Sequence, residues 1–567
     1  GQATSAPAGG KFYRVIVRDG IGGTTVFDTG GGDIPRDTAA ASYVATSGQT
    51  ATITKSGASY IVQDDWEPRN GYTHQLSDGT YVVYVTNNGK IEAAPSTGVF
   101  ATLVTTGVAA VPATADPHLA DFAAWGDYLY IASGIGNTSH RRNGTGTPSA
   151  ITDTHGAYND DYTTPTAIGS GKMPKCNFVE AHGGYLFCAY IQEAATQKNR
   201  IRWSHPPGEL TGPEDWAELD YIDIASGGGY ITGLRSYRDH LLIFKTDSVW
   251  ALYGYNSESW QLVQVSRNSG APATTAIAQS ADAVFYYSPA AKGGIYVYTG
   301  NTPVLISEKL RIMLEEITDH EDTWLAWVDQ KLWCSMPWID GDARSTDESS
   351  VFVFDPTVGS GAWVRHSPAL GDLTVIIEGS DTAVGSPLAA ICGHSGAACL
   401  VQLNHNPLVA YDIILEDETQ SAFDTLYSTG WQHAGSPSYR KSWRRPKIVI
   451  AQSNEDVTVE IATYHDYNEA SSRRSHTVEV LAQGATFWRL TGALETNGFD
   501  WGDGALWGAA TAEGSSIERF QPASEGAGGL GTCRSVQLRL STAAASAGKA
   551  WGISAIVIKY VARRQTT

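Results

Sequence analysis

Residues 238–254, RDHLLIFKTDSVWALYG, contain two short apolar runs separated by four polar residues. The first run, 241–244, is apolar at every position, as expected of a strand that is buried on both faces. The second run, 249–253, is β-branched and aromatic and ends at Gly254, so the stretch predicts a hairpin connected by residues 245–248. An isolated hairpin is only marginally stable in water. This hairpin therefore needs neighbouring strands.

The first half of this hairpin recurs along the chain. The related stretches are GDYLYIASG from 126, GGYLFCAYI from 183, RDHLLIFKT from 238, ADAVFYYSP from 281 and VDQKLWCSM from 328. The second positions of these stretches are Asp127, Gly184, Asp239, Asp282 and Asp329. The spacings between them are 57, 55, 43 and 47 residues (184−127, 239−184, 282−239, 329−282). Weaker copies are SDGTYVVYV from 77 and GSPLAAICG from 385. A period slightly above forty, with insertions, is typical of four-stranded propeller blades and predicts six or seven of them; a β-sandwich with regular turns is the alternative.

Composition supports an all-β chain with substantial cores. The 567 residues are 42% hydrophobic, and 60 Gly, 27 Tyr and 17 Trp against 3 Met favour turns and aromatic strands over long helices. The formal net charge of −20 argues against a surface that clamps nucleic acid or anionic lipid. The chain has no run of eighteen apolar residues and no secretory signal pattern at its start, which predicts a soluble protein made in the cytoplasm.

Cysteine usage and metal motifs predict neither a disulfide scaffold nor a cofactor. Six cysteines in 567 residues are too few for a disulfide framework, so buried thiols are expected. Cys392, His394 and Cys399 lack the paired spacing of a zinc site. Asp340, Asp342 and neighbouring acids lack the order of a calcium loop. No cofactor and no metal are therefore predicted.

The pattern divides the chain into three regions. We predict an N-terminal β module over 1–70, a β-propeller over 71–410 and a C-terminal antiparallel β-sandwich over 411–567, whose strands alternate apolar and polar residues. One segment, ISEKLRIMLEEI, reads as a helix with Ser307 as its N-cap. The apolar face of that helix consists of Leu310, Met313, Leu314 and Ile317.

The propeller region contains a polar segment, 135–175, that is predicted to be a loop insert. It is rich in Gly, Thr, Ser and Asn and has no apolar period. Long loops are usually functional or disordered, so we expect this one either to order against a partner or channel, or to be a plain insertion. The candidate contact residues are Asn137, His140, Asn143, Asp160 and Asp161.

A single dense basic cluster, in the segment YRKSWRRPK, stands out in the acidic chain. It is either a solvated face or a surface that docks on an acidic region of a neighbouring subunit. Its members, the candidate subunit-interface residues, are Arg440, Lys441, Arg444, Arg445 and Lys447.

Motifs of catalysis are absent from the sequence. It has no HExxH, no phosphate-binding glycine loop, no GxSxG and no Rossmann fingerprint. Propellers can be glycosidases, which need two converging carboxylates, but the acidic clusters that begin at Glu315, Asp340 and Glu416 show no such convergence in linear sequence. We therefore predict no catalytic residue and no enzyme.

Residues 201–254 carry aromatic landmarks, a W-S-x-P segment followed by a second Trp and by G-x-I-T-x-L. Here these are Trp203, Ser204, Pro206, Trp216, Ile231, Thr232 and Leu234. This pattern resembles the virion proteins of tailed bacteriophages that form the tail nozzle, also called tail tubular protein B. Two further segments, GIYVYTGNTPVLISEKL and TGWQHAGSPSYRKSWRRPKIVI, resemble a later blade and a C-terminal strand pair of the same proteins, so the likeness covers roughly residues 180–450.

The resemblance implies a structural protein of the phage tail. It implies a virion location after assembly in the host cytoplasm, a homo-hexameric ring, and a conduit for genome ejection from a short-tailed bacteriophage. The implied partners are an adaptor ring, tail fibres or spikes, and double-stranded DNA that passes without specific binding. No membrane anchor is expected for the protein. An acidic conduit would repel DNA phosphate, which suits the net charge of −20. The alternatives are a host-surface carbohydrate-binding or glycosidase-type propeller, and a minor tail or baseplate protein of a long-tailed phage.

Overall fold

The computed structural model describes most of the central and C-terminal chain. The described residues are 16–18, 25–28, 42–44, 50–52, 68–153, 172–366, 373–480, 517–518 and 531–562, with internal gaps, the longest of which are 105–119 and 337–350. The chain forms two compact units. The first unit comprises Gly1–Gln402 and Ile414–Asp417, and the second comprises Leu403–Ile413 and Glu418–Thr567. The predicted boundary at residue 411 coincides with the first residue of β34, Tyr411–Ile414.

Six four-stranded sheets follow one another along the described part of the first unit, and a five-stranded sheet comes after them, of which the first three strands lie in this unit. Their first strands are β5 (Pro68–Gln75), β9 (Asp121–Trp125), β15 (Lys175–His182), β19 (Ile231–Tyr237), β23 (Ile277–Gln279), β27 (Trp324–Val328) and β31 (Leu373–Glu378). Their second strands are β6 (Tyr81–Asn87), β10 (Tyr128–Ala132), β16 (Tyr185–Gln192), β20 (His240–Lys245), β24 (Val284–Ser288), β28 (Lys331–Ser335) and β32 (Leu388–His394).

The outer strands complete each sheet in antiparallel order. The third strands are β7 (Lys90–Pro95), β11 (His140–Asn143), β17 (Thr196–Trp203), β21 (Val249–Tyr253), β25 (Gly294–Tyr298), β29 (Val351–Asp355) and β33 (Ala397–Gln402). The fourth strands of the first six sheets are β8 (Ala101–Val104), β12 (Ser149–Ala150), β18 (Tyr221–Asp223), β22 (Gln261–Ser266), β26 (Val304–Leu305) and β30 (Ala362–His366). In the last sheet β34 pairs with β35 (Gln420–Ala422).

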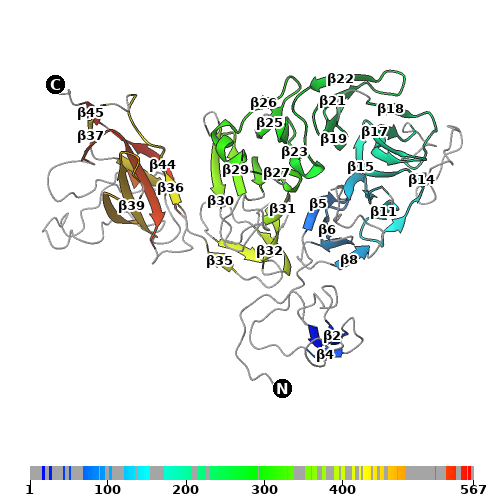
Figure 1. The fold of residues 1–567 in the computed structure, drawn as a ribbon, viewed down its shortest axis with the longest axis horizontal. Coiled ribbons are helices and arrows are strands. Elements are labelled where there is room, and N and C mark those ends of the chain that lie inside the picture. Colours follow the sequence, from blue (N-terminus) through cyan, green and yellow to red (C-terminus); the bar gives the residue numbers. More distant parts are fainter. Residues whose placement is uncertain are drawn as a thin grey trace. The chain divides into compact units, whose positions relative to one another are not determined.

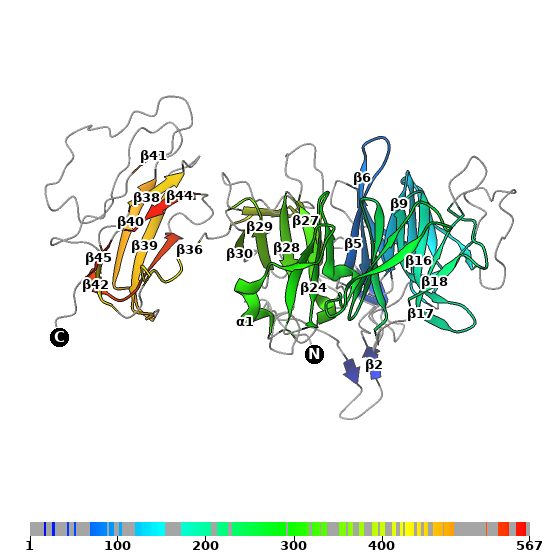
Figure 2. The same cartoon turned by 90° about the horizontal axis from the view of Figure 1, so that it is seen from above.

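The sheets are arranged around a common axis, with their first strands innermost (Figure 1). The first strand of each sheet contacts that of the next, except that β19 meets the 3-10 turn Thr274–Ala276 immediately before β23, and β31 closes the ring against β5. Figure 2 shows the inner strands running roughly along this axis. The predicted all-β fold with a central β-propeller is thereby confirmed.

The repeated stretches form the second strands of the sheets. In the quoted hairpin, β20 is buried along its whole length, and Phe244 pairs with Val249 across the connection formed by residues 245–248. The Lys245 backbone N–H donates to the Ser248 carbonyl at 2.9 Å and closes this connection. The predicted hairpin is confirmed as β20–β21.

Acids that recur at the aligned positions join one sheet to the preceding sheet. The backbone N–H and the hydroxyl of Ser77, in the first sheet, both donate to the Asp127 carboxylate of the second sheet at 2.7 Å. In the same way Arg238, in the fourth sheet, pairs with the Asp282 carboxylate of the fifth sheet at 3.3 Å. The repeat therefore marks contacts between neighbouring sheets as well as turns within them.

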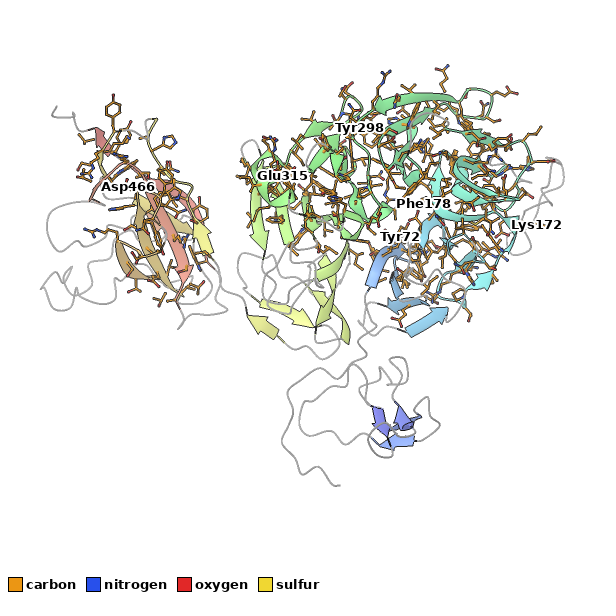
Figure 3. The ribbon with its side chains drawn as sticks, in the orientation of Figure 1. Tyr72, Lys172, Phe178, Tyr298, Glu315 and Asp466 are labelled. Carbon is orange, nitrogen blue, oxygen red and sulfur yellow. The ribbon has the colours of Figure 1, made fainter. Side chains whose placement is uncertain are left out.

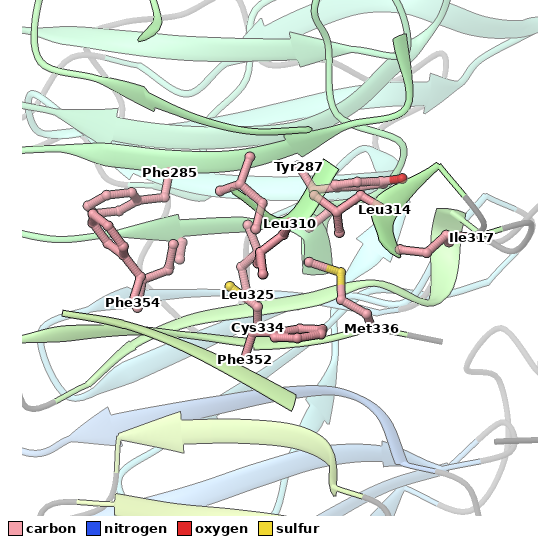
Figure 4. Close-up of a cluster of buried hydrophobic side chains, with 14 of the residues drawn as sticks. Phe285, Tyr287, Leu310, Leu314, Ile317, Leu325, Cys334, Met336, Phe352 and Phe354 are labelled. Atoms are coloured by element: carbon pink, nitrogen blue, oxygen red, sulfur yellow. The ribbon is translucent and has the colours of Figure 1, made fainter. Parts of the chain in front are cut away.

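The hydrophobic cores lie between adjacent sheets, which explains why the second strands are apolar on both faces. Figure 4 shows the core between the fifth and sixth sheets, where Phe285 and Tyr287 face Leu325, Phe352 and other side chains. The face of residues 310–317 contributes to this core, because Leu310, Leu314 and Ile317 are buried in it and Met313 packs against it.

The helix predicted over residues 306–317 is much shorter than expected. A 3-10 turn, Glu308–Leu310, precedes a single α-helical turn, α1, Arg311–Leu314. Ser307 makes no cap hydrogen bond with its side chain; its Oγ instead accepts the backbone N–H of Ile295 in β25 at 2.8 Å. The predicted N-cap was wrong because the Ser307 hydroxyl is hydrogen-bonded to the neighbouring strand β25 instead of to the helix.

Part of the predicted loop insert forms β-strands. Residues 140–143 and 149–150 form β11 and β12, the outer half of the second sheet, and β13 (Thr152–Asp153) pairs in parallel with β14 (Lys172–Met173). Residues 154–171 lie outside the described residues. Strand β11 shows no apolar pattern because its two central positions are arginines, Arg141 and Arg142, and both are buried.

The second unit is built from a four-stranded sheet and two three-stranded sheets in its described part. The first contains β36 (Leu426–Ser428), β43 (Val536–Thr542), β39 (Val457–His465) and β40 (Arg474–Val480). The others contain β42 (Gly531–Cys533), β37 (Lys441–Trp443), β45 (Tyr560–Ala562), β41 (Ile517–Glu518), β38 (Lys447–Ala451) and β44 (Gly552–Val557). One core packs Val459 and Leu538 of the four-stranded sheet with Trp443 of β37. The predicted C-terminal β-sandwich is confirmed.

The N-terminal region contributes two described hairpins. In the first, β1 (Ile16–Arg18) pairs with β2 (Thr25–Asp28), and in the second β3 (Ser42–Val44) pairs with β4 (Thr50–Thr52), both antiparallel. Among the described residues of the whole chain, helices are too short and too polar to cross a bilayer.

Candidate functional site

The innermost strands of the first four sheets carry a cluster of polar side chains. The cluster consists of Tyr72 on β5, Asp121 on β9, Glu180 on β15 and Arg235 on β19. Figure 3 labels Tyr72 close to the middle of the ring of sheets. Successive first strands contact one another, so their topology brings these groups together from a stretch of more than 160 residues (235−72).

Two carboxyl groups of this axial cluster have raised pKa values. Burial raises the pKa of Asp121 to about 6, although Arg235 and the backbone N–H groups of Val179 and Phe122 oppose the shift. Burial raises the pKa of Glu180 to about 8, with a further contribution from the negative charge of Asp121, while Arg235 opposes it. Desolvation disfavours the charged form of an acid, and a neighbouring acid adds to this effect.

Arg235 is held in place by the backbone. Its Nη1 donates to its neighbour, the Leu234 carbonyl, at 2.7 Å, and its Nη2 donates to the Thr274 carbonyl at 3.0 Å, in the turn before the fifth sheet. The Val179 N–H donates to Asp121 Oδ2 at 3.2 Å. The charges of the cluster are therefore fixed on strands and turns, which is how electrostatic sites are preorganised.

The arrangement holds a proton-bearing acid close to an ionised one. Near pH 7 Glu180 retains its proton, Asp121 is mostly ionised, and Arg235 supplies the compensating positive charge. The phenol of Tyr72 stays neutral because burial, and then Glu180, raise its pKa. Two acids with separated pKa values can divide the roles of acid and base between them. Among the described residues, no group of three His, Cys, Asp or Glu side chains is placed to hold a metal ion.

Sequence reasoning did not find these carboxylates. Of the acidic clusters singled out there, Glu315 pairs with Arg311 at 3.1 Å, while the acids from Asp340 and from Glu416 lie outside the described residues. One signal was available in the sequence. Glu180 and Arg235 each lie four residues before an aligned turn position (184−180 and 239−235). That places both charged residues in an innermost strand, at a position where an apolar residue would be expected.

The basic cluster predicted as a subunit interface is divided by the structure. Arg440 is exposed, whereas Lys441 is buried at the start of β37 and its Nζ donates to the Tyr439 carbonyl at 3.0 Å. Arg444 and Arg445 lie outside the described residues, and for Lys447 the structure describes only the backbone of β38. Lys441 was therefore wrongly placed on a docking surface, because a strand alternates buried and exposed positions.

The loop candidates belong largely to the second sheet. His140 lies on β11, half-buried, with its Nδ1 at 3.2 Å from Ser133 Oγ, and burial lowers its pKa. Asn143 ends the same strand, and its Nδ2 donates to the Tyr128 hydroxyl at 3.4 Å. Asn137 is half-buried just before the strand, and its backbone N–H donates to the Gly134 carbonyl at 3.2 Å. Asp160 and Asp161 lie outside the described residues.

The described thiols are buried, as expected. Cys176, Cys188, Cys334 and Cys533 are free and buried. Burial raises the pKa of Cys188 and of Cys334, so both are held as neutral thiols.

Comparison with known proteins shows similarity at the level of the fold. No family model matches the chain, and no curated protein matches it. Two solved structures of similar fold are a streptogramin B lyase, with 11% identity and a TM-score of 0.35, and a selenomethionine-substituted virginiamycin B lyase from Staphylococcus aureus, with 11% identity and a TM-score of 0.33. Each alignment covers 58% of this chain and 92% of the other chain. At this degree of similarity, the activity of those enzymes says nothing about the activity of this chain.

Proposed function

We propose that this protein is a structural subunit of a bacteriophage tail nozzle, which assembles into a ring of six copies and conducts the genome. The observation that carries the proposal is the landmark pattern of residues 201–254, which resembles that family. The proposed partners are an adaptor ring, tail fibres or spikes, and DNA in transit.

The landmark residues make structural contacts, as expected if the pattern encodes a scaffold. Trp203 is buried and meets Trp260 edge to face at 4.3 Å. Ser204 Oγ accepts the Leu186 N–H at 3.0 Å, and Thr232 Oγ1 donates to the Ala271 carbonyl at 2.7 Å. Trp216 is buried in the core between the second and third sheets. These contacts position strands, and the propeller they build offers loops on which a larger assembly can be mounted.

Charge is the second support for a conduit. A net charge of −20 per subunit multiplies in a ring, and like charge lowers the residence of phosphate on a wall. A surface meant to hold DNA would need the opposite sign. The proposal therefore places DNA as a passing cargo.

Electron microscopy of the purified full-length chain tests the proposal. We expect rings of six copies with an axial hole, because a closed ring satisfies heterologous contacts at every subunit. Replacing Arg440, Arg444 and Arg445 together by glutamate should raise the ring dissociation constant about 100-fold, since like-charge contacts across an interface cost several kcal/mol and each tenfold is ~1.4 kcal/mol.

The matched control for this assembly experiment is Arg267→Glu, which reverses an exposed arginine after β22 and should leave the rings intact. Chains that remain single copies in concentrated samples would contradict the nozzle. Rings that survive the triple charge reversal would contradict the docking role of the basic cluster. They would not contradict the nozzle proposal.

A second candidate function is favoured by the axial cluster. Asp121 and Glu180 pair an ionised carboxylate with a protonated one, which is the combination that glycoside hydrolysis uses. A glycosidase-type propeller would hydrolyse oligosaccharides, and Glu180→Gln would lower that rate about 10²–10⁴-fold through loss of the general acid. A hydrolysis assay on a panel of oligosaccharides checks this. Absence of turnover, or equal turnover by Glu180→Gln, removes the candidate.

A further inference from the structure

The tip of the β39–β40 hairpin in the second unit has an unusual backbone. Asp466 and Tyr467, with φ of 51° and 63°, both lie in the left-handed region. His465 and Asn468 bridge across them, and the Asn468 N–H donates to the His465 carbonyl at 3.0 Å. A two-residue turn of this kind favours Asn or Gly, because a bulky side chain is strained at positive φ. Tyr467 therefore occupies a position that costs free energy of folding.

Burial does not compensate for this strain. The Tyr467 side chain is 57% exposed. Its ring lies against the ring of Trp431, with centroids 4.9 Å apart and planes at 40°. Trp431 is itself half-buried, in the segment that follows β36. Together the two rings form a partly exposed aromatic pair, and strain that is retained at an exposed position points to a function.

The pair is built from two segments that are both fastened to the start of β43. Gln432 and Val536 exchange backbone hydrogen bonds of 2.8 and 3.1 Å, which positions Trp431. The Asp466 carboxylate accepts the N–H groups of Arg534 and Ser535 at 2.5 and 3.1 Å, which positions Tyr467. Figure 3 labels Asp466 at this place in the second unit. Because these hydrogen bonds within the chain hold both segments, binding would not have to order the aromatic pair.

The groups around the pair indicate the chemistry of the ligand. Gln432, His433 and Asn468 are exposed on the same two segments and offer amide and imidazole groups. Aromatic rings present an apolar face, and such polar neighbours hydrogen-bond hydroxyl groups beside it. A pyranose sugar has both features, one face of C–H groups and a rim of hydroxyls. A nucleotide base would also stack, but its phosphates would meet a chain of net charge −20.

We propose that Trp431 and Tyr467 form a binding site for a neutral oligosaccharide. The sugar stacks on the exposed aromatic surface, and Gln432, His433 and Asn468 hydrogen-bond its hydroxyls. The site lies in the C-terminal β-sandwich, so it rests neither on the nozzle proposal nor on the axial cluster of the propeller.

Isothermal titration of the full-length chain with four probes tests the site: maltohexaose, cellohexaose, mannohexaose and chitohexaose. We expect at least one probe to bind. Tyr467→Asn removes the ring and supplies a residue that the turn prefers, so this variant should bind that probe about tenfold or more weakly, with an unchanged or higher melting temperature. Tyr467→Phe keeps the ring and should bind like the original protein.

Tyr439→Ala is the matched control, because Tyr439 is an exposed tyrosine of the same unit outside the pair, and it should leave binding unchanged. Failure of all four probes to bind would overturn the proposal. So would full binding by Tyr467→Asn, or a fall of several degrees in its melting temperature, which would give the ring a structural role. Binding of single-stranded oligothymidylate in place of the sugars would replace the proposal with base stacking.

Discussion

Replacing Arg141 by leucine should lower the free energy of unfolding of the first unit by about 3–5 kcal/mol, because removal of one partner from a buried ion pair leaves the other charge poorly compensated. Arg141 Nη1 lies 2.8 Å from Glu214 Oε1, and their side chains are 8% and 0% exposed. The Tyr130 hydroxyl donates to the same oxygen at 3.1 Å. Arg141 belongs to the second sheet and Glu214 to the loop between β17 and β18 of the third, so the pair fastens two neighbouring sheets. Urea unfolding followed by tryptophan fluorescence measures the loss.

A matched control comes from another ion pair between adjacent sheets. Arg238 and Asp282 join the fourth and fifth sheets at 3.3 Å, but their side chains are 51% and 91% exposed. Arg238→Leu should therefore cost only about 0–1 kcal/mol. In the double variant Arg141→Leu/Glu214→Leu, part of the lost stability should return, since no buried charge remains. Equal decreases in the free energy of unfolding for Arg141→Leu and Arg238→Leu would show that burial does not determine how much these ion pairs stabilise the protein.

The stability of the propeller should fall as the pH rises from about 5 to about 8, and Glu180→Gln should remove most of this dependence. The pKa of Glu180 is raised on folding from its ordinary value of 4.5 to about 8, so the folded state holds the proton more tightly than the unfolded state. The stabilising contribution of the protonated form is complete below pH 4.5 and is lost as the pH rises through 8, at no more than about 1.4 kcal/mol per pH unit. Asp121 adds the same trend between 3.8 and about 6.

Melting temperatures measured at intervals from pH 4 to pH 9 check this prediction. Glutamine keeps the shape of the side chain without its charge, so Glu180→Gln should match or exceed the original protein at the alkaline end. Glu258→Gln, at an exposed position after β21, is the control and should keep the original pH profile. A Glu180→Gln profile parallel to the original one would mean that the axial carboxyl does not retain its proton on folding.

The local elements were largely predictable. The hairpin around Leu241 and the recurring acids at Asp127 and Asp282 follow from short-range patterns, because a strand buried on both faces must be apolar on both faces. The same reasoning failed over residues 140–150. In the sequence, Arg141 and Arg142 resemble loop residues. In the folded chain Arg141 pairs with Glu214, and the Tyr84 hydroxyl lies 2.6 Å from Arg142 Nη1. Both partners are more than fifty residues away in sequence, so no local pattern shows them.

Functional groups depended even more on the tertiary structure. Asp121, Glu180 and Arg235 are unremarkable in sequence and become a cluster only because first strands meet around an axis. Ser307 was expected to cap a helix, yet its hydroxyl accepts the Ile295 N–H instead. Trp431 and Tyr467 meet because separate segments share the start of β43 as an anchor.

Local sequence patterns were enough to predict the class of fold and the repeat, because strand burial and turn chemistry depend on neighbouring residues, and the acidic net charge follows from composition alone. The three-dimensional contacts were needed to show which charges are buried together, which basic residues are exposed, and where aromatic rings pair. These properties depend on contacts between residues that are distant in the chain, and it is desolvation at such contacts that sets the pKa values and the energetic weight of each group.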